Sequence, residues 1–337
     1  MQEFDFRSSD REKTISMTNT SSTWDFLSPD LTELILSYLP IPSIISATSV
    51  CKLWNYIIHS HSFITRKSIS ARSFPWFVLS SQHKCFSENN QLFAFDPESN
   101  HWVKLPNTTF LSKNSFSISN EFLFTTCQTS PVRFSGCNSR IGGLEDIQTP
   151  LPEVFRPGNS SKLLSSALFN RKIYLLGIYS NFISSFDLEK HLWSNVQTLR
   201  PPGVMFSYLI SCQIGLVFAG LCSVQDYYEF NLWRIDEKTL EFSEIGIMPC
   251  DLLSGFLDGE RDGNFGRLKC VGSGNVVYVF DDEYPWNHPI CVCEFSGSGK
   301  CSWRRIMNLP GPVNKLDKFI SSCSYVSVLD VLGNATD

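Results

Sequence analysis

The feature that most constrains this fold is a repeat of strand patterns that runs through most of the chain. Four segments share an apolar strand, an acidic turn and a final strand carrying Trp or Phe. They lie at 92–106, 173–193, 215–242 and 276–303, with a weaker fifth at 121–152. The aromatic or apolar residue of the final strand falls at Trp102, Ile147, Trp193, Phe242 and Trp303, in steps of 45, 46, 49 and 61 residues. Repeats of about 40 to 50 residues with four strands each are typical of β-propeller blades.

This pattern predicts an all-β propeller of five blades, or of six if the longest step contains extra strands. One such sheet leaves an apolar face bare, and radial stacking against its neighbours buries that face. The apolar strands are expected near the ring centre, and the aromatic residue of each outer strand is expected to pack against the next blade. The segment 75–80 resembles the second strand of a blade and has no first strand before it. The segment 318–329 resembles a strand that no further strands follow. We therefore expect the C-terminal strand to complete the first blade.

The composition agrees with a packed, sheet-rich protein and argues against some classes of partner. Aromatic residues make up 13% of the chain and suit the half-buried surface of a pleated sheet. The net charge of −5, without a run of Lys and Arg, argues against nucleic acid, whose phosphates require clustered cations. No stretch approaches the ~18 apolar residues of a membrane span. We expect neither nucleic-acid nor membrane binding.

The 12 cysteines are scattered and contain no Cys-x-x-Cys pair, so neither a metal site nor a cofactor is predicted. Cys291 and Cys293 alternate onto one face of a strand, where core packing is favoured over metal binding. The segment from Met1 to Thr23 is acidic and lacks an apolar core, so it resembles neither an export signal nor a transit peptide. We therefore expect reduced thiols in a protein of the cytoplasm, the nucleus or both.

The N-terminal part has a helical pattern instead. Ser28 and Pro29 suit a helix cap and first turn, and the first helix is expected to stop at Pro40. A second helix is predicted from Ser43, and strands are expected to begin after Lys67. Two short helices in about 45 residues cannot cover their own apolar stripes, because so short a chain rarely folds stably alone. Another surface must cover part of them.

This helical segment resembles an F-box. The matching residues are Phe26 to Leu31, Ile35 to Pro40, Ile44, the run Val50-Cys51-Lys52-Leu53-Trp54, and Phe63. The Val-Cys-Lys-x-Trp element is the most specific part, and one departure is Ser28, inserted where Leu and Pro are usually adjacent. The remainder is similar to the kelch-type propellers of plant F-box/kelch-repeat proteins. Its Gly-Gly pair, a mark of kelch repeats, occurs only at Gly142-Gly143 and does not clearly fit the usual position.

The resemblance implies an α+β multidomain protein whose parts act separately. The parts are a disordered tail at 1–22, an F-box at 23–68, a kelch-like β-propeller at 72–330 and a C-terminal tail at 331–337. F-boxes bind a Skp-family adaptor, and through it a cullin, in SCF-type ubiquitin ligases, while the repeats capture the target protein. The chain would be a non-catalytic substrate adaptor. By position, the adaptor-binding residues would be Leu27, Pro29, Leu31, Ile35, Leu39, Ile44, Val50, Cys51 and Trp54.

A target protein is expected to bind the loops between the second and third strands of the blades, since rigid scaffolds present function on loops. The aromatic candidates for this contact are Tyr179, Tyr227, Tyr284 and Trp286. Two alternatives remain open: a propeller scaffold outside ubiquitination, and a metal-dependent propeller oxidase. The dispersed histidines and the lack of catalytic motifs disfavour the oxidase. Failure to bind a Skp-family adaptor would favour the scaffold.

Overall fold

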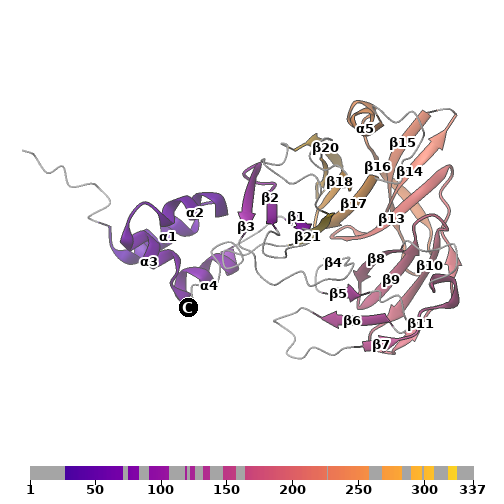
Figure 1. Ribbon diagram of the computed structural model, residues 1–337, viewed down its shortest axis with the longest axis horizontal. Helices are drawn as coiled ribbons and strands as arrows, with labels where there is room; N and C mark the ends of the chain where they lie inside the picture. The colour runs from indigo at the N-terminus through magenta and orange to yellow at the C-terminus, as the bar shows by residue number, and fades with distance from the viewer. Residues whose placement is uncertain are drawn as a thin grey trace, which may run out of the picture.

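The computed structural model divides into a helical end and a sheet-rich remainder, drawn in indigo-violet and in magenta to yellow in Figure 1. It describes residues 27–70, 75–82, 91–105, 118–119, 122–125, 132–136, 147–156, 164–225, 227–257, 268–282, 290–297, 300–306 and 318–324. This division confirms the predicted fold class, a small helical region followed by an all-β domain of antiparallel sheets.

Four short helices form the part that we call the head. They are α1 (Pro29–Ser37), α2 (Ile41–Thr48), α3 (Lys52–Ile58) and α4 (His61–Ser70). The first helix begins as predicted, because the Ser28 hydroxyl accepts a hydrogen bond from the Leu31 N–H at 3.3 Å and Pro29 occupies the first turn. The head has its own small core of fully or nearly fully buried residues: Leu36, Ile44, Ala47, Ile57, Ile58 and Phe63.

The prediction of a single second helix is wrong, because the chain breaks it into α2 and α3. The Thr48 hydroxyl donates to the Ile45 carbonyl at 2.7 Å, a side-chain bond that competes with helix continuation. Cys51 then caps α3, since its sulfur accepts from the Trp54 N–H at 3.4 Å. The helix α4 also extends past Lys67, where the sequence pattern predicts strands.

In the described residues after the head, five antiparallel sheets, which we call blades, carry most of the fold. Blade 1 contains β21 (Lys318–Ser324), β1 (Trp76–Gln82), β2 (Gln91–Asp96) and β3 (His101–Leu105). Blade 2 contains β4 (Ile118–Ser119), β5 (Phe122–Thr125), β6 (Val132–Gly136) and β7 (Ile147–Thr149), followed by a 3-10 turn at Glu153–Phe155. Blade 3 contains β8 (Leu164–Phe169), β9 (Lys172–Gly177), β10 (Phe182–Asp187), β11 (Leu192–Trp193) and the short β12 (Gln197–Thr198), which also pairs with β10.

The last two blades share the largest buried core cluster of the described residues. Blade 4 contains β13 (Val204–Cys212), β14 (Gly215–Val224), β15 (Tyr227–Ile235) and β16 (Phe242–Ile247). Blade 5 contains β17 (Leu268–Ser273), β18 (Val276–Asp281), β19 (Cys291–Phe295) and β20 (Cys301–Arg305). The helix α5 (Cys250–Leu257) lies between them in sequence and packs its apolar side into their shared core. Part of the longest repeat step is therefore helix, and the described residues form five blades.

The innermost strands β4, β8, β13, β17 and β21 neighbour one another in a closed ring. β21 pairs with β1 in antiparallel register, with Ser321 opposite Leu79. The C-terminal strand thus completes the first blade, which confirms the predicted closure. It also means that blade 1 is built from two segments far apart in the sequence.

The apolar strands are the second strands of the blades, counted from the ring centre. They were predicted near the centre, and they lie next to the innermost strands. Examples are β1, β9, β14 and β18, whereas the innermost strands carry buried serines. The Ser165 hydroxyl accepts from the Leu209 N–H at 2.9 Å and donates to the Leu209 carbonyl at 3.3 Å, linking blade 3 to blade 4. Small polar side chains fit where strands converge and can hydrogen-bond the neighbouring backbone.

Aromatic contacts fill the spaces between blades. Phe77 of blade 1 has its ring centroid 5.2 Å from that of Tyr278 and 5.0 Å from that of Phe280, both in blade 5. Trp193 of blade 3 donates its ring N–H to the Thr149 hydroxyl of blade 2 at 3.2 Å. The Trp193 contact comes from an outer strand, as predicted, whereas Phe77, Tyr278 and Phe280 belong to second strands.

The head also packs on blade 1, on the side of its sheet that does not carry Phe77 and Leu79. Ile41 and Ile45 of α2 pack against a cluster that includes Trp76, Val78 and Ala94. Figure 1 accordingly shows β1 to β3 as the strands nearest the helices. The head is therefore packed on the propeller, and only part of its apolar surface is used for this contact.

Acidic turns connect the third and fourth strands in several blades, as the sequence predicts. The Asp187 carboxylate accepts from the Glu189 and Lys190 N–H groups at 2.9 and 3.0 Å, and Asp236 repeats this arrangement. These hydrogen bonds, the main cause, lower the pKa of both aspartates. A residue with positive φ lies one or two positions before the fourth strand in three blades: Asn100 in blade 1, His191 in blade 3 and Leu240 in blade 4. The same local geometry thus starts the outer strand of blades 1, 3 and 4.

Candidate partner-binding surfaces

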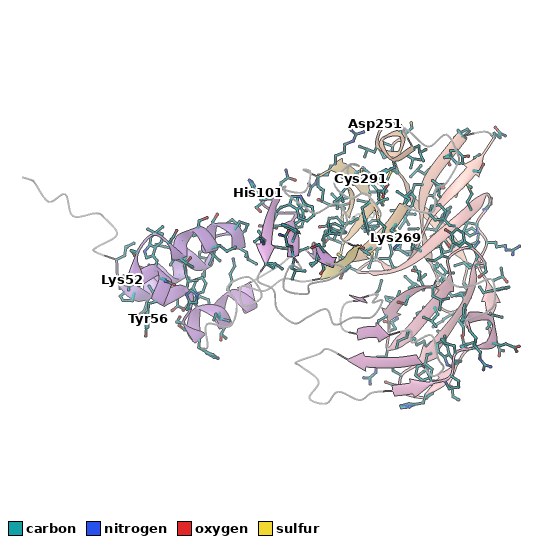
Figure 2. All side chains as sticks on the ribbon, in the orientation of Figure 1. Lys52, Tyr56, His101, Asp251, Lys269 and Cys291 are labelled. Atoms are coloured by element: carbon teal, nitrogen blue, oxygen red, sulfur yellow. The ribbon has the colours of Figure 1, made fainter. Side chains whose placement is uncertain are left out.

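The head exposes a set of large apolar side chains that we call the head surface. They come from α1 and the residue that caps its end, from the connection between α2 and α3, and from α3, which packs against both α1 and α2: Leu31, Ile35, Tyr38, Val50, Leu53 and Tyr56. Their exposed fractions run from 39% for Ile35 to 78% for Tyr38. Figure 2 places Tyr56 and Lys52 at the end of the head that is farthest from the blades. Within the described residues this surface has no apolar cover.

The local sequence explains why these side chains point outward. The caps at Ser28 and Cys51 fix where α1 and α3 begin, and hence which of their faces meet. Because Leu36 and Ile57 fill the space between the helices, the opposite sides of α1 and α3 remain exposed. The break before α3 leaves Val50, with an exposed fraction of 62%, in an open connection.

The structure distributes the predicted adaptor-binding residues over three environments. Five are exposed: Pro29, Leu31, Ile35, Val50 and Cys51. Leu27, Leu39 and Trp54 are partly buried, and the last two pack against the core of the head. Ile44 is fully buried in that core, so it supports the surface from within and is not itself presented to a partner.

Sequence reasoning missed Tyr38, Leu53 and Tyr56 as parts of this surface. For Leu53 a signal existed, because it lies within the Val-Cys-Lys-x-Trp element. The two tyrosines belong to no motif. Their exposure depends on how the helices pack, which the spacing of apolar residues along the sequence does not reveal.

Charged contacts hold α4 against α1 beneath this surface. Arg66 pairs with Glu33 at 3.0 Å, and the Lys67 ammonium donates to the carbonyls of Ser37 and Leu39 at 3.0 and 2.7 Å. Burial, the largest influence, lowers the pKa of Lys67, while Glu98 and Asp96 in the acidic turn of blade 1 act in the opposite direction. Lys67 thus joins the end of α1 to the junction with the propeller.

The connections between second and third strands all lie on one side of the ring, which we call the upper face, because neighbouring strands alternate in direction. Tyr179 lies in such a connection and Tyr227 is the first residue of β15, where another connection ends; each is 50% exposed. The Tyr179 ring packs edge-on to Phe206 at 6.2 Å, which limits its motion. The other two predicted target contacts, Tyr284 and Trp286, lie outside the described residues.

Two further exposed side chains on the upper face, Tyr228 and Met205, were not among the predicted contacts, although Tyr228 lies at the end of a predicted loop. Tyr228 follows Tyr227 at the start of β15. Met205 lies where the pairing of β13 with β14 shifts register, between Val204 and Phe206, and such bulges redirect side chains. Pattern alternation alone cannot predict where a bulge falls.

The thiols and histidines in the described part of the chain are not arranged as a metal centre. No group of three or more His, Cys, Asp or Glu side chains in these ranges is placed to hold an ion. Burial raises the pKa of the Cys222 and Cys291 thiols to about 12, so both stay protonated at neutral pH. Within the same ranges, no helix is long and apolar enough to cross a bilayer.

Comparison with known proteins finds relatives that extend over both parts of the fold. The F-box domain family matches residues 24–66. An F-box/kelch-repeat protein of Arabidopsis thaliana is 24% identical over 365 aligned positions, covering 90% of each chain. F-box only protein 13 of the same plant is 30% identical over 383 positions, covering 85% of this chain and 80% of that protein. A second Arabidopsis F-box/kelch-repeat protein is 34% identical over 152 positions, covering 42% of this chain and 33% of that protein.

Proposed function

Because this chain belongs to the plant F-box/kelch-repeat family, we propose that it is the substrate-recognition subunit of an SCF-type ubiquitin ligase. In this role the head binds a Skp-family adaptor, which connects it to a cullin, and the propeller captures the protein to be ubiquitinated. The chain contributes binding surfaces rather than catalytic groups, and it acts in the cytoplasm, the nucleus or both.

The observation that carries this proposal is the head surface. Large apolar side chains left in water are costly, and burying one fully contributes about 1.5–3 kcal/mol. Leu31, Val50 and Tyr56 are each at least half exposed, so a partner that covers them gains much of this amount per residue. Several such contacts are enough to offset the entropy lost on association. The head also packs on blade 1 through other residues, Ile41 and Ile45, so both contacts can exist together.

Adaptor binding is tested by co-expressing the full chain with a recombinant plant Skp-family adaptor and following co-elution in size-exclusion chromatography. The wild type is expected to co-elute with the adaptor. The double substitution Leu31→Asp and Val50→Asp is expected to abolish co-elution, because two charges would be buried without partners. A matched control is Leu192→Asp on blade 3, where Leu192 is 66% exposed and distant in sequence from the head.

The control variant should retain the adaptor, which separates a local effect from a general effect of an added charge. A wild-type chain that is folded by circular dichroism yet never co-elutes with any Skp-family adaptor would contradict the proposal and favour a scaffold outside ubiquitination.

For the target protein we propose the upper face, with Tyr179, Tyr227, Tyr284 and Trp286 as contacts. Aromatic side chains supply large contact areas and are enriched among the residues that dominate binding energy. Replacing Tyr284 and Trp286 together by Ala, and separately Tyr179 and Tyr227, should reduce recovery of target proteins from plant extract by quantitative mass spectrometry. The adaptor should be recovered in unchanged amounts. Equal loss of adaptor and targets would indicate misfolding and would remove the support for this assignment.

A further inference from the structure

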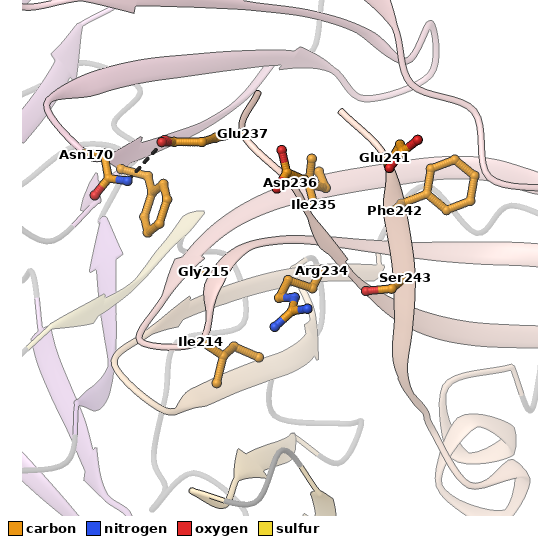
Figure 3. Close-up of a pocket in the computed structure, with 11 residues that line it drawn as sticks. Asn170, Ile214, Gly215, Arg234, Ile235, Asp236, Glu237, Glu241, Phe242 and Ser243 are labelled. Atoms are coloured by element: carbon orange, nitrogen blue, oxygen red, sulfur yellow. Dashed lines mark hydrogen bonds between the residues drawn. The ribbon is translucent and has the colours of Figure 1, made fainter. Parts of the chain in front are cut away.

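A groove of about 440 Å³ opens between blades 3 and 4 on the side opposite the upper face. We call this side the lower face; it carries the turns between first and second strands and between third and fourth strands. Three hairpins line the groove: the turn after Phe169, the turn before Gly215 and the acidic turn from Asp236 to Phe242. Figure 3 shows the paired Asn170 and Glu237 on one side of the groove and Glu241 with Phe242 on the other.

One wall of the groove is a carboxylate in a fixed position. The Asn170 side-chain amide donates to Glu237 at 3.1 Å, and Asn170 itself has a positive φ of 47° that directs the turn. The Tyr174 hydroxyl, on a side chain 97% buried, faces this carboxylate without meeting the geometry of a hydrogen bond. Burial and the Glu237 charge raise the pKa of Tyr174 to about 12. Glu237 is therefore oriented before any ligand arrives.

The opposite wall departs from the rule followed by the other outer strands. Trp102, Trp193 and Trp303 pack against cores of buried residues, whereas Phe242 at the equivalent repeat position is 39% exposed beside the groove. The core contact in this blade is supplied instead by Leu240. An exposed ring next to carboxylates offers a surface for a cation and for an aliphatic chain.

The charge of the groove favours a positive ligand. Asp236, Glu237 and Glu241 line it together with one cation, Arg234, which leaves a net charge of −2. One oxygen of Asp236, Oδ1, already accepts two backbone N–H groups that hold the turn, so we assign Glu237 and Glu241 to the ligand. No acidic side chain in the described ranges lies within ion-pair distance of Arg234.

From this arrangement we propose that the groove binds an arginine or lysine side chain of an extended segment in a partner protein. The cationic end lies between Glu237 and Glu241, and the aliphatic stem lies against Ile214 and Phe242. Arg234 repels the ligand and moderates its affinity. The site is on the lower face, so it can be occupied while the upper face and the head surface hold other proteins.

The test uses the full chain with isotope-labelled isoleucine methyl groups, observed by NMR. The Ile214 methyl resonance is identified by an Ile214→Leu substitution. Acetylated pentapeptides with a central Arg, Gln or Glu between Gly and Ala residues are then titrated into the protein. We expect the Ile214 resonance to shift with the Arg peptide and to remain unchanged with the Gln and Glu peptides.

Substitutions of the charged groove residues test whether the negative charge of the groove causes the binding. E237Q combined with E241Q should weaken binding of the Arg peptide by about five- to tenfold, and R234Q should strengthen it by about two- to threefold, as expected for exposed charge pairs. An unchanged affinity in E237Q/E241Q, or preferred binding of the Glu peptide, would overturn the proposal. Co-elution with the Skp-family adaptor should be identical for all these variants, so this result is independent of the proposed ligase role.

Discussion

Two buried tyrosines allow the energetic value of one blade-to-blade hydrogen bond to be measured. Tyr278 of blade 5 is fully buried, and its hydroxyl donates to the Pro75 carbonyl, at the start of blade 1, at 3.0 Å. Tyr174 of blade 3 is almost as buried, yet its hydroxyl makes no hydrogen bond within the described residues. The substitutions Tyr278→Phe and Tyr174→Phe remove the same atom, in one case from a hydrogen bond to a buried carbonyl and in the other from a position that faces the Glu237 carboxylate.

The expected free energies of unfolding differ between the two variants. Tyr278→Phe leaves the buried Pro75 carbonyl without this donor, which costs about 1–3 kcal/mol. Tyr174→Phe removes a buried hydroxyl that makes no hydrogen bond of good geometry, so its cost should be smaller than that of Tyr278→Phe and close to zero. For a domain of this size, a cost of about 1–3 kcal/mol lowers the melting temperature by roughly 2–10 °C.

Urea unfolding followed by tryptophan fluorescence, with calorimetry as a second measurement, compares both variants with the wild type. The wild type and both variants should show the same dependence of free energy on urea concentration, because no surface is newly exposed. Equal destabilisation by the two substitutions would refute the reasoning, since it would mean that loss of the hydroxyl, and not loss of its hydrogen bond, decides the cost.

Three other outcomes are expected. Leu31→Ala with Val50→Ala should weaken adaptor binding by roughly 10- to 100-fold in calorimetric titration, because each side chain has about half of its ~1.5–3 kcal/mol left to gain on burial; an affinity within twofold of wild type would contradict it. Burial raises the pKa of Cys291 from 9.0 to about 12, so the thiol ionises in the unfolded chain before it does in the folded one. The free energy of unfolding should therefore fall as the pH rises from about 9 towards 12. A Cys291→Val chain should lose less of this free energy between about pH 8 and pH 10, as measured from urea midpoints. Native alkylation followed by mass spectrometry should label the exposed Cys51 and Cys250 well before Cys291, and the reverse order would contradict the described burial.

The repeat architecture could be predicted from sequence because its signals are local. An Asp followed by a positive-φ residue and an aromatic strand recurs around Asp187 and Asp236, and each copy fixes a hairpin without help from the rest of the chain. Even the closing strand was visible as an unpaired pattern. The helices of the head were predicted less well, since Thr48 and Cys51 end and start helices through single side-chain bonds that no periodicity reveals.

Sites assembled from distant hairpins could not be predicted in this way. The groove on the lower face combines Asn170, Gly215 and Glu241, which come from three separate turns and share no motif. Ile44 illustrates the opposite error: it fits the expected stripe, but the head needs it for its own core. Whether an apolar residue faces inward or outward depends on which helices meet, and that is a property of the tertiary structure.

The pairing of β21 with β1 has a consequence for synthesis on the ribosome. Blade 1 stays incomplete until residues 318–324 have left the exit tunnel, although the head that rests on this blade is translated first. During that interval the edge of β1, with Phe77 and Leu79, is open to pairing with other chains, as unpaired strand edges are. A chain interrupted upstream of β21 should therefore expose this edge and yield aggregating products rather than shorter functional ones.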